Sequence, residues 1–263
     1  MIPPSTKDLQ LPDLIELRFE GPVAIVTLCR APVNAISDEW IDALNRVLDV
    51  LENRLDVSVL WLRSSQKVFC AGADLALMSE RFVDAAGRGL MIDLTRRMQE
   101  VYSRLECIPQ VTIAEIGGHA LGGGFELALA CDLRIVADNA KIGLPEARLG
   151  LLPAAGGTQR MTRLVGDAMA RRLILGAEVV LGADAVALGL VHWSAPAADL
   201  PLRTQELAQR IAVLPAHALA ACKRCVGAAL ETGCTAFELE LEASASLLAS
   251  GATQTLVQRF LKK

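Results

Sequence analysis

The sequence predicts an α/β protein in which short strands alternate with helices and a purely helical region follows. Apolar runs of strand length recur up to about Pro196, amphipathic segments with helical spacing separate them, and only helical patterns follow Leu200. We therefore expect a core over residues 1–196 and a C-terminal helical region over residues 197–263. The second part is too short for an ordinary independent domain, so it should pack on the core or on another subunit.

The first predicted elements are two strands and a helix. Residues 14–19 and 23–28 have strand-like composition, and Glu20-Gly21-Pro22 between them predicts a tight hairpin turn. Ser37 is a candidate N-cap for a helix with Asp38 and Glu39 in its first turn. The apolar residues that follow at helical spacing are Ile41, Leu44, Val47, Leu48 and Leu51.

The alternation continues through the middle of the chain. Strands are expected over residues 57–63, 111–116 and 133–137, and an amphipathic helix over about residues 90–107, which Pro109 ends. A loop should end in residues 69–74. Another helix is expected to open within residues 154–160, with Thr158 as its possible cap.

Composition excludes several classes of protein. Of 263 residues, 52% are apolar and 21% charged, and no apolar run approaches the roughly 20 residues that span a bilayer. The net charge of −4 has no basic face, so a nucleic-acid partner is unsupported. The N-terminal residues have neither a secretory nor an Arg-rich pattern, which predicts a cytoplasmic protein. Cys222 and Cys225 lack a second ligand pair, so we expect no metal.

A glycine-rich turn carries the first chemical signal. Residues 117–124 hold five glycines between a predicted strand and a predicted helix. Glycine lets the backbone approach a ligand closely, and N–H groups at a helix start can bind an oxyanion, so Gly123 is our candidate donor. The glycines could instead serve close helix–strand packing or a phosphate loop. The Walker Lys-Ser/Thr is absent, however, and the spacing differs from a dinucleotide fingerprint.

Two glutamates near this turn are candidates for chemistry. Glu126 lies in the first turn of the predicted helix among apolar residues, where burial raises a carboxyl pKa and the helix N-terminus lowers it. Such a carboxyl is either paired structurally or kept for catalysis, and the motif alone leaves both readings open. Glu146 taken alone is more typical of an exposed loop or of a partner for Arg148.

The other polar residues predict structural roles. Asp132 ends one predicted element and precedes another, so it should cap a helix or pair with Arg134 or Arg160. No Ser–His–Asp arrangement accompanies the three histidines, and we read all of them as structural. They are His119, His192 and His217.

Five stretches together identify a family. They are Val33-Asn34-Ala35-Ile36, Phe69-Cys70-Ala71-Gly72-Ala73-Asp74, Ala120-Leu121-Gly122-Gly123-Gly124-Phe125-Glu126-Leu127-Ala128, Cys131-Asp132-Leu133-Arg134 and Gly156-Gly157-Thr158-Gln159-Arg160. In order and spacing they resemble the enoyl-CoA hydratase/isomerase (crotonase) superfamily over nearly the whole chain. The resemblance implies a crotonase-like spiral of repeated ββα units. It also implies a C-terminal helical region that builds homotrimers, often paired into hexamers.

The resemblance also implies residue roles. Glu126 and Glu146 match the catalytic carboxylates of hydratases, and Ala73 and Gly123 match the two oxyanion-hole donors. Glu126 would activate water at C3 and Glu146 would chiefly transfer a proton at C2. No cofactor is implied, because coenzyme A is part of the acyl-CoA substrate. The residues expected to contact substrate or CoA are Ala71, Asp74, Leu75, Ala76, Gly122 and, from a neighbouring subunit, Phe260 and Lys263.

The sequence departs from the family pattern at three places. Leu144 stands where hydratases often carry glutamine, Ala154 stands where glycine is usual, and residues 250–255 look altered. If position 154 requires positive φ, alanine there would be strained and could shift the backbone beside the water. The apolar Leu144 could favour a bulkier or branched acyl group.

The leading hypothesis is a 2-enoyl-CoA hydratase. The alternatives within the family are a 3-enoyl-CoA to 2-enoyl-CoA isomerase and a hydratase of branched, methylglutaconyl-type thioesters. The alternative from another class is a catalytically weak CoA-thioester-binding or assembly protein, which the alanine at position 154 favours.

Overall fold

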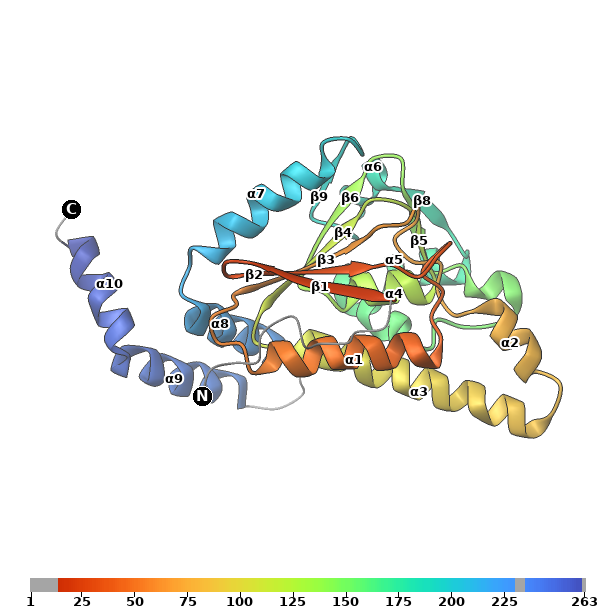
Figure 1. The fold of residues 1–263 in the computed structure, drawn as a ribbon, viewed down its shortest axis with the longest axis horizontal. Helices are drawn as coiled ribbons and strands as arrows, with labels where there is room; N and C mark the ends of the chain where they lie inside the picture. The colour runs from red at the N-terminus through yellow and green to blue at the C-terminus, as the bar shows by residue number, and fades with distance from the viewer. Residues whose placement is uncertain (1–13, 230–234, 262–263) are drawn as a thin grey trace.

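The computed structural model describes residues 14–229 and 235–261 and has a mainly parallel sheet at its centre (Figure 1). The strand order is β1-β2-β3-β4-β6-β9, with β1 antiparallel to β2 and the other neighbours parallel. These strands are β1 (Ile15–Glu20), β2 (Val23–Leu28), β3 (Val59–Ser64), β4 (Val111–Ile116), β6 (Leu133–Ala137) and β9 (Trp193–Ala195). A small second sheet joins β5 (Ala120–Leu121), β7 (Lys141–Gly143) and β8 (Val179–Leu181).

Helices surround this sheet and continue beyond it. The helices before β9 are α1 (Asp38–Glu52), α2 (Leu75–Arg81), α3 (Ala85–Cys107), α4 (Gly123–Leu129), the 3₁₀ turn η2 (Glu146–Leu149), α5 (Gly157–Leu175) and α6 (Gly182–Ala185). Those after it are α7 (Leu200–Ala212), α8 (Ala216–Ala228), α9 (Thr235–Ala249) and α10 (Gly251–Leu261). The predicted α/β class and the helical C-terminal part are therefore confirmed.

The N-terminal predictions are confirmed in detail. Gly21 supplies the positive φ of the turn between β1 and β2, and all six residues of β2 are buried. Ser37 caps α1, because its Oγ accepts a hydrogen bond from the Trp40 N–H. The expected apolar side of α1 is buried against the core. Strong apolar periodicity and a clear N-cap thus made the elements in this part of the chain predictable from the sequence.

Two helix starts differ from the prediction. Thr158 does not cap α5; Gly156 does, in a left-handed conformation with φ of 98°, and Thr158 lies inside the first turn. Glycine reaches this conformation without strain, which explains why it takes the cap position. α3 begins at Ala85 rather than near Leu90, because the Asp84 carboxylate accepts a hydrogen bond of 2.7 Å from the Gly87 N–H.

Helix α2 was not predicted, and its packing explains why. None of its residues is buried, so it shows no apolar stripe. Its start depends on Asp74, whose Oδ1 accepts hydrogen bonds from the Ala76 and Leu77 N–H groups at 3.1 and 3.2 Å. The same carboxylate forms an ion pair with Arg30 at 2.8 Å. Asp74 therefore fixes the chain directly after Ala73.

The C-terminal helices differ in how they contact the core. α7 buries Leu200, Thr204, Leu207 and Ala208 and lies on the main sheet, whereas α9 and α10 extend away from it (Figure 1). The large apolar side chains that α8, α9 and α10 leave exposed are Val226, Phe237, Leu241, Leu248, Leu256, Val257 and Leu261. The division between residues 196 and 197 stays a prediction.

Within the described ranges, no single helix is both long and apolar enough to cross a membrane. α7 and α8 together reach that length and composition, but the chain bends by 101° between them.

Helix α8 is fastened to the sheet by an ion pair. The expected partners of Asp132 were wrong: its Oδ2 accepts hydrogen bonds from the Thr112 N–H and hydroxyl at 2.7 and 2.9 Å and pairs with Lys223 Nζ at 2.8 Å. Lys223 also donates to the Gln110 carbonyl at 2.9 Å. Arg134 instead donates to backbone carbonyls, including that of Cys131 at 2.7 Å. The lysine thus joins α8 to the beginning of β4.

We predict that Lys223→Met lowers the free energy of unfolding by about 1–3 kcal/mol, because partly buried Asp132 loses its counter-charge. Urea unfolding at neutral pH measures this. The matched control is Arg224→Met, at an exposed neighbouring position, which should change stability by less than about 0.5 kcal/mol. Equal effects of the two substitutions would contradict the role of Lys223.

Candidate active site

One cavity of about 250 Å³ brings most of the predicted site residues together. It lies between α2 and α3, the glycine turn before α4, and residues 145–155. Those predicted residues that line it are Ala71, Ala73, Leu75, Gly122, Gly123, Glu126 and Glu146. Asp74 and Ala76 are adjacent in sequence but do not line it. The Phe260 side chain and Lys263 lie outside the described residues, so their predicted CoA contact is not placed.

Two backbone N–H groups in this cavity are free to bind an oxygen. Ile36 donates to the Gly72 carbonyl at 2.9 Å and accepts from the Asp74 N–H at 3.0 Å, so the intervening Ala73 N–H is directed elsewhere. Gly123 is the first residue of α4, where N–H groups have no partner within the helix. Neither N–H has an acceptor among the described residues. The pair can therefore act as an oxyanion hole.

The two donor segments touch because glycines stand at the contact. Gly72 has φ of 94°, and a Cβ there would lie 3.0 Å from the Leu121 carbonyl oxygen and 3.1 Å from the Gly123 nitrogen. Any side chain at this position would separate the segments or strain the backbone. The glycine in the predicted motif before Ala73 is therefore required by a close approach of two chain segments.

Tyr102 and Met98 of α3 contact the chain at Gly123 and hold it in place. The buried Tyr102 hydroxyl donates a hydrogen bond of 2.9 Å to the Gly123 carbonyl, and burial raises the pKa of this phenol. Met98 Cε would lie 2.8 Å from a Cβ at Gly123. Sequence analysis missed both residues. The available signal was that Tyr102 is the only tyrosine in the chain and lies on the apolar side of a predicted helix.

Glu126 is a nearly buried carboxyl whose partner is the backbone. Only 2% of the residue is exposed, and its Oε1 accepts a hydrogen bond of 2.7 Å from the Gly157 N–H. Burial, reinforced by the charge of Glu146, raises the Glu126 pKa to about 7, although the Gly157 and Ala155 N–H groups and Arg160 oppose the shift. Glu126 is therefore poised to exchange a proton near neutral pH.

Glu146 reaches the same cavity from the start of η2. Its Oε2 is buried without a partner among the described residues, and burial raises its pKa. Gly122 lies beside it, because a Cβ on Gly122 would be 3.1 Å from Glu146 Oε1. Arg148 does not pair with Glu146 but donates to the Ala177 carbonyl at 2.6 Å. The local reading of Glu146 as an exposed loop residue or an ion-pair partner was therefore wrong.

The loop before α5, whose Gly157 N–H is hydrogen-bonded to Glu126, does not have a positive φ at Ala154. The only non-glycine residues with positive φ in the described chain are Asn34 and Ala177, so alanine is compatible with position 154. The Ala154 carbonyl accepts a hydrogen bond of 2.6 Å from Gln99, which fixes the loop against α3. The positive-φ strain suspected at Ala154 is thus absent.

Arg160 supports the same loop from α5. Its guanidinium donates to the Ala155 carbonyl at 3.1 Å and forms an ion pair with Glu106 at 2.9 Å. A Cβ on Gly157 would lie 2.6 Å from Glu126 Oε1, so only glycine lets the loop meet this carboxyl. The Gly156-Gly157 and Arg160 parts of the predicted motif therefore position Glu126.

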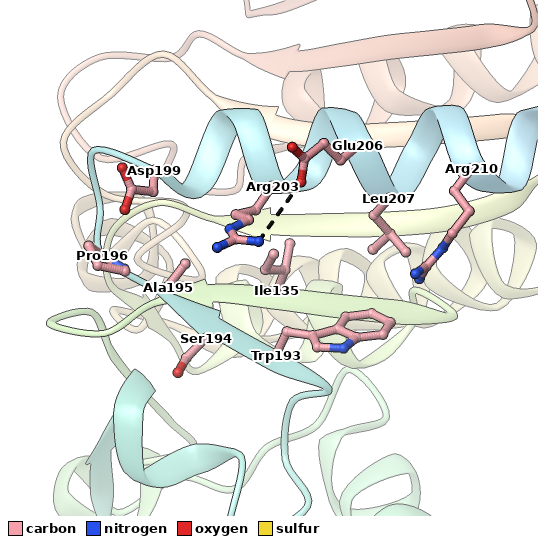
Figure 2. A pocket seen from close by; sticks show the side chains of 10 residues that line it. All are labelled: Ile135, Trp193, Ser194, Ala195, Pro196, Asp199, Arg203, Glu206, Leu207 and Arg210. Atoms are coloured by element: carbon pink, nitrogen blue, oxygen red, sulfur yellow. Dashed lines mark ion pairs between the residues drawn. The ribbon is translucent and has the colours of Figure 1, made fainter.

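A second hollow, between β9 and α7, lacks these features (Figure 2). It is larger, at about 360 Å³, and shares no lining residue with the first. Its charged residues are two arginines and two acids, with Arg203 and Glu206 in a loose pair at 4.0 Å. It contains no buried carboxyl and none of the predicted site residues. The cavity with Glu126 and Glu146 is therefore the candidate active site.

The geometry defines a class of chemistry. Two carboxyl groups with raised pKa values face one cavity that also holds two free N–H groups. Such a site can move protons beside a carbonyl group while the N–H groups stabilise the negative oxygen that forms. This arrangement is suited to an enzyme that performs acid–base chemistry on a thioester or a similar carbonyl compound.

Comparisons with known proteins give the family. The family model described as enoyl-CoA hydratase/isomerase matches residues 18–263, and the chain belongs to this family. A short-chain-enoyl-CoA hydratase of Clostridium acetobutylicum is 32% identical over 251 residues, covering 94% of each chain. A probable enoyl-CoA hydratase of Bacillus subtilis is 40% identical over 177 residues, 67% of each.

Solved structures agree with the expected crotonase-like fold. DspI of Pseudomonas aeruginosa has a TM-score of 0.90 at 32% identity, covering 98% of this chain and 97% of DspI. An enoyl-CoA hydratase of Bacillus anthracis has a TM-score of 0.88 at 30% identity, covering 95% and 96%. The fold predicted from the resemblance is thereby confirmed, whereas its association into trimers stays a prediction.

We predict that Glu126→Gln stabilises the fold at pH 8 by about 1–3 kcal/mol and that the gain shrinks toward pH 5. The Glu126 pKa is about 7 in the fold against an ordinary 4.5, so between these values the folded state binds more protons than the unfolded state. Stability from this group therefore falls as pH rises through that window. Urea unfolding at several pH values measures the difference.

The matched control for this pH experiment is Glu100→Gln, on the exposed side of α3. It should change stability by less than about 0.5 kcal/mol at every pH. A Glu126→Gln effect that is independent of pH would show that Glu126 titrates normally, and one that grows toward acid pH would show a lowered pKa; either result would contradict the raised pKa.

Proposed function

We propose that this protein is an enoyl-CoA hydratase that adds water across the double bond of a 2-enoyl-CoA thioester. The observation that carries the proposal is that the carboxyl groups of buried Glu126 and half-buried Glu146 share one cavity with the free Ala73 and Gly123 N–H groups. Hydration needs a base for water, an acid for the α-carbon and donors for the thioester oxygen. The hydratase names of the Clostridium and Bacillus relatives support the same reaction.

In the proposed mechanism the carboxyl groups of Glu126 and Glu146 act as a pair that holds one proton. Because the charge of Glu146 disfavours ionisation of Glu126, a pair that holds one proton is the expected resting state near neutral pH. In the reactive form of the pair the proton lies on Glu146, and ionised Glu126 takes a proton from water as the water oxygen bonds to C3. The electron pair of the double bond moves toward the thioester oxygen, which Ala73 and Gly123 hold, and C2 then takes a proton from Glu146.

The proposed reaction consumes one water and returns one proton to the pair. Glu126 ends protonated and Glu146 ionised, so a single proton transfer between them or through solvent restores the starting state. No electron acceptor or donor takes part. The proposal therefore includes no cofactor, and coenzyme A enters only as part of the substrate.

The other candidate activities rest on weaker observations. Isomerisation of 3-enoyl-CoA would use the same carboxyls, and the family description includes isomerases. A methylglutaconyl-CoA hydratase of Mus musculus is 39% identical over 159 residues, which is 60% of this chain and 49% of that protein. Chromatography of the products from 2-enoyl-CoA and 3-enoyl-CoA separates hydration from isomerisation. The alternative of a catalytically weak binding protein was based on Ala154, and this residue does not have a positive φ.

A homotrimer or a hexamer of paired trimers is part of the proposal. The exposed apolar side chains of α8, α9 and α10 form a surface that a second copy of the chain would cover. The predicted contact of Phe260 and Lys263 with CoA bound by a neighbouring subunit belongs to this assembly. The proposed substrate contacts of Ala71, Leu75 and Gly122 belong to the chain that holds the carboxyls.

We predict that Glu126→Gln and Glu146→Gln each lower kcat/KM for crotonyl-CoA by about 10²–10⁴-fold, because each removes a proton-transfer group. Loss of the conjugated thioester absorbance measures turnover, and calorimetry with butyryl-CoA should show binding within about threefold of wild type. Glu100→Gln is the control and should keep full activity. Unchanged turnover in both active-site variants would contradict the assigned roles.

We also predict that light scattering gives the mass of a trimer or a hexamer of the 28.1 kDa chain. Leu241→Asp on α9, where the leucine is 72% exposed, should dissociate the assembly. Leu55→Asp, at a position 84% exposed before β3, makes the same change away from these helices and should leave the mass unchanged. A monomeric wild type would contradict the proposed assembly.

A further inference from the structure

The cavity has one part that the proposed chemistry does not use. The thioester oxygen would lie against Ala73 and Gly123, and C2 and C3 against Glu126 and Glu146. Everything beyond C3 must then enter the rest of the cavity. That part is lined mainly by side chains of α2, α3 and residues 149–152, among them Met78, Met91, Leu94, Met98, Leu149 and Leu152.

The side chains that line this part of the cavity, which we call the wall, include no group that could pair with a charge on the acyl chain. Glu126 and Glu146 are the only charged residues among the described residues that line the cavity. The Thr95 hydroxyl donates to the Met91 carbonyl at 2.9 Å, so its proton is already engaged. An acyl group ending in a carboxylate would lose water, find no cation and meet two further carboxyl groups.

This part of the cavity has more apolar lining side chains than the end of a four-carbon acyl group could contact. Crotonyl places a single methyl group beyond C3, yet side chains from three segments surround this space. Leu149 and Leu152 each remain 63% exposed, so a longer aliphatic chain would remove further apolar surface from water. Met78, Met91 and Met98 have flexible, unbranched side chains that can adapt to chains of different length.

We infer that the substrate is an uncharged aliphatic 2-enoyl-CoA with a chain longer than four carbons, and that α2 and α3 form the wall that selects it. This inference rests on the proposed function of the same site. It predicts a substrate specificity different from that of hydratases that act on carboxylated acyl groups such as methylglutaconyl. It also assigns specificity to Met91, which contacts none of the reacting atoms.

Binding of saturated thioesters tests the inference without requiring turnover. Isothermal calorimetry would compare butyryl-CoA, octanoyl-CoA and glutaryl-CoA. Each buried methylene contributes about fourfold in affinity, so octanoyl-CoA should bind at least about tenfold more tightly than butyryl-CoA even if its chain is only partly buried. Glutaryl-CoA should bind at least about tenfold more weakly than butyryl-CoA. Equal affinities, or tighter binding of glutaryl-CoA, would overturn the inference.

A substitution in the wall tests which residues select the chain. Met91→Phe, which makes the side chain bulkier and stiffer, should lower the octanoyl-to-butyryl affinity ratio by about tenfold and leave butyryl-CoA binding unchanged. Leu90→Phe makes a comparable change at a neighbouring position, 52% exposed and outside the cavity, and should leave the ratio unchanged. Should Met91→Phe fail to fold, Met78→Phe on α2 makes the same test. Unchanged ratios in a folded wall variant would contradict the assignment.

Kinetics separate a failure of this inference from a failure of the proposed function. With wild-type protein, kcat/KM for 2-octenoyl-CoA should exceed that for crotonyl-CoA by at least about tenfold. If no enoyl-CoA is turned over while octanoyl-CoA still binds preferentially, the hydratase proposal fails and the acyl preference stands. If crotonyl-CoA is hydrated best and binding is independent of length, the hydratase proposal stands and the acyl preference fails.

Discussion

A carboxyl group buried at the start of a helix imposes the main constraint on this structure. Every residue of α4 is buried, so the helix carries Glu126 into the protein interior, and its Oε1 is hydrogen-bonded to the Gly157 N–H. An ionised carboxylate there is costly, and the nearby Glu146 makes it costlier. The site therefore holds Glu126 near the midpoint of its titration, which is the property that proton transfer at neutral pH requires.

Much of the surrounding structure serves to bring backbone N–H groups close to that carboxyl. Gly157 must lack a side chain to reach Glu126, and Arg160 and Gln99 hold its loop in place. Gly72 meets the Gly123 segment for the same steric reason. These contacts bring N–H groups to the cavity without adding further charged side chains. The cavity can thus remain apolar, which serves the raised pKa values and, in our proposal, the binding of an aliphatic acyl chain.

The fold could be predicted from the sequence wherever a local pattern decided it. The apolar runs of β2, β4 and β6 and the Ser37 cap of α1 are such patterns, and the structure confirms them. α2 escaped prediction because it buries none of its residues and so shows no periodicity. The small sheet escaped because β5, β7 and β8 have only two or three residues each, too few for an alternating pattern.

The site was only partly accessible to the same reasoning. Glu126 stood out because it is a single acid in an apolar run beside a glycine turn. Glu146 looked like an ordinary loop residue, and only the family resemblance assigned it to the site. Its burial depends on the fold of η2 against the glycine turn, and the Glu126–Gly157 bond joins positions 31 residues apart. Contacts of this kind are set by tertiary structure, so no local pattern encodes them.

The central claim is that Glu126 titrates near neutral pH and that the charge of Glu146 contributes to its raised pKa, and a direct titration tests it. Carbon-13 NMR of protein with labelled glutamate carboxyls, assigned by the signal that Glu126→Gln removes, would follow this one group. The account predicts a transition near pH 7 that moves to lower pH in Glu146→Gln, because the neighbouring charge is then gone. A Glu126 transition near the ordinary 4.5, unchanged by Glu146→Gln, would contradict it.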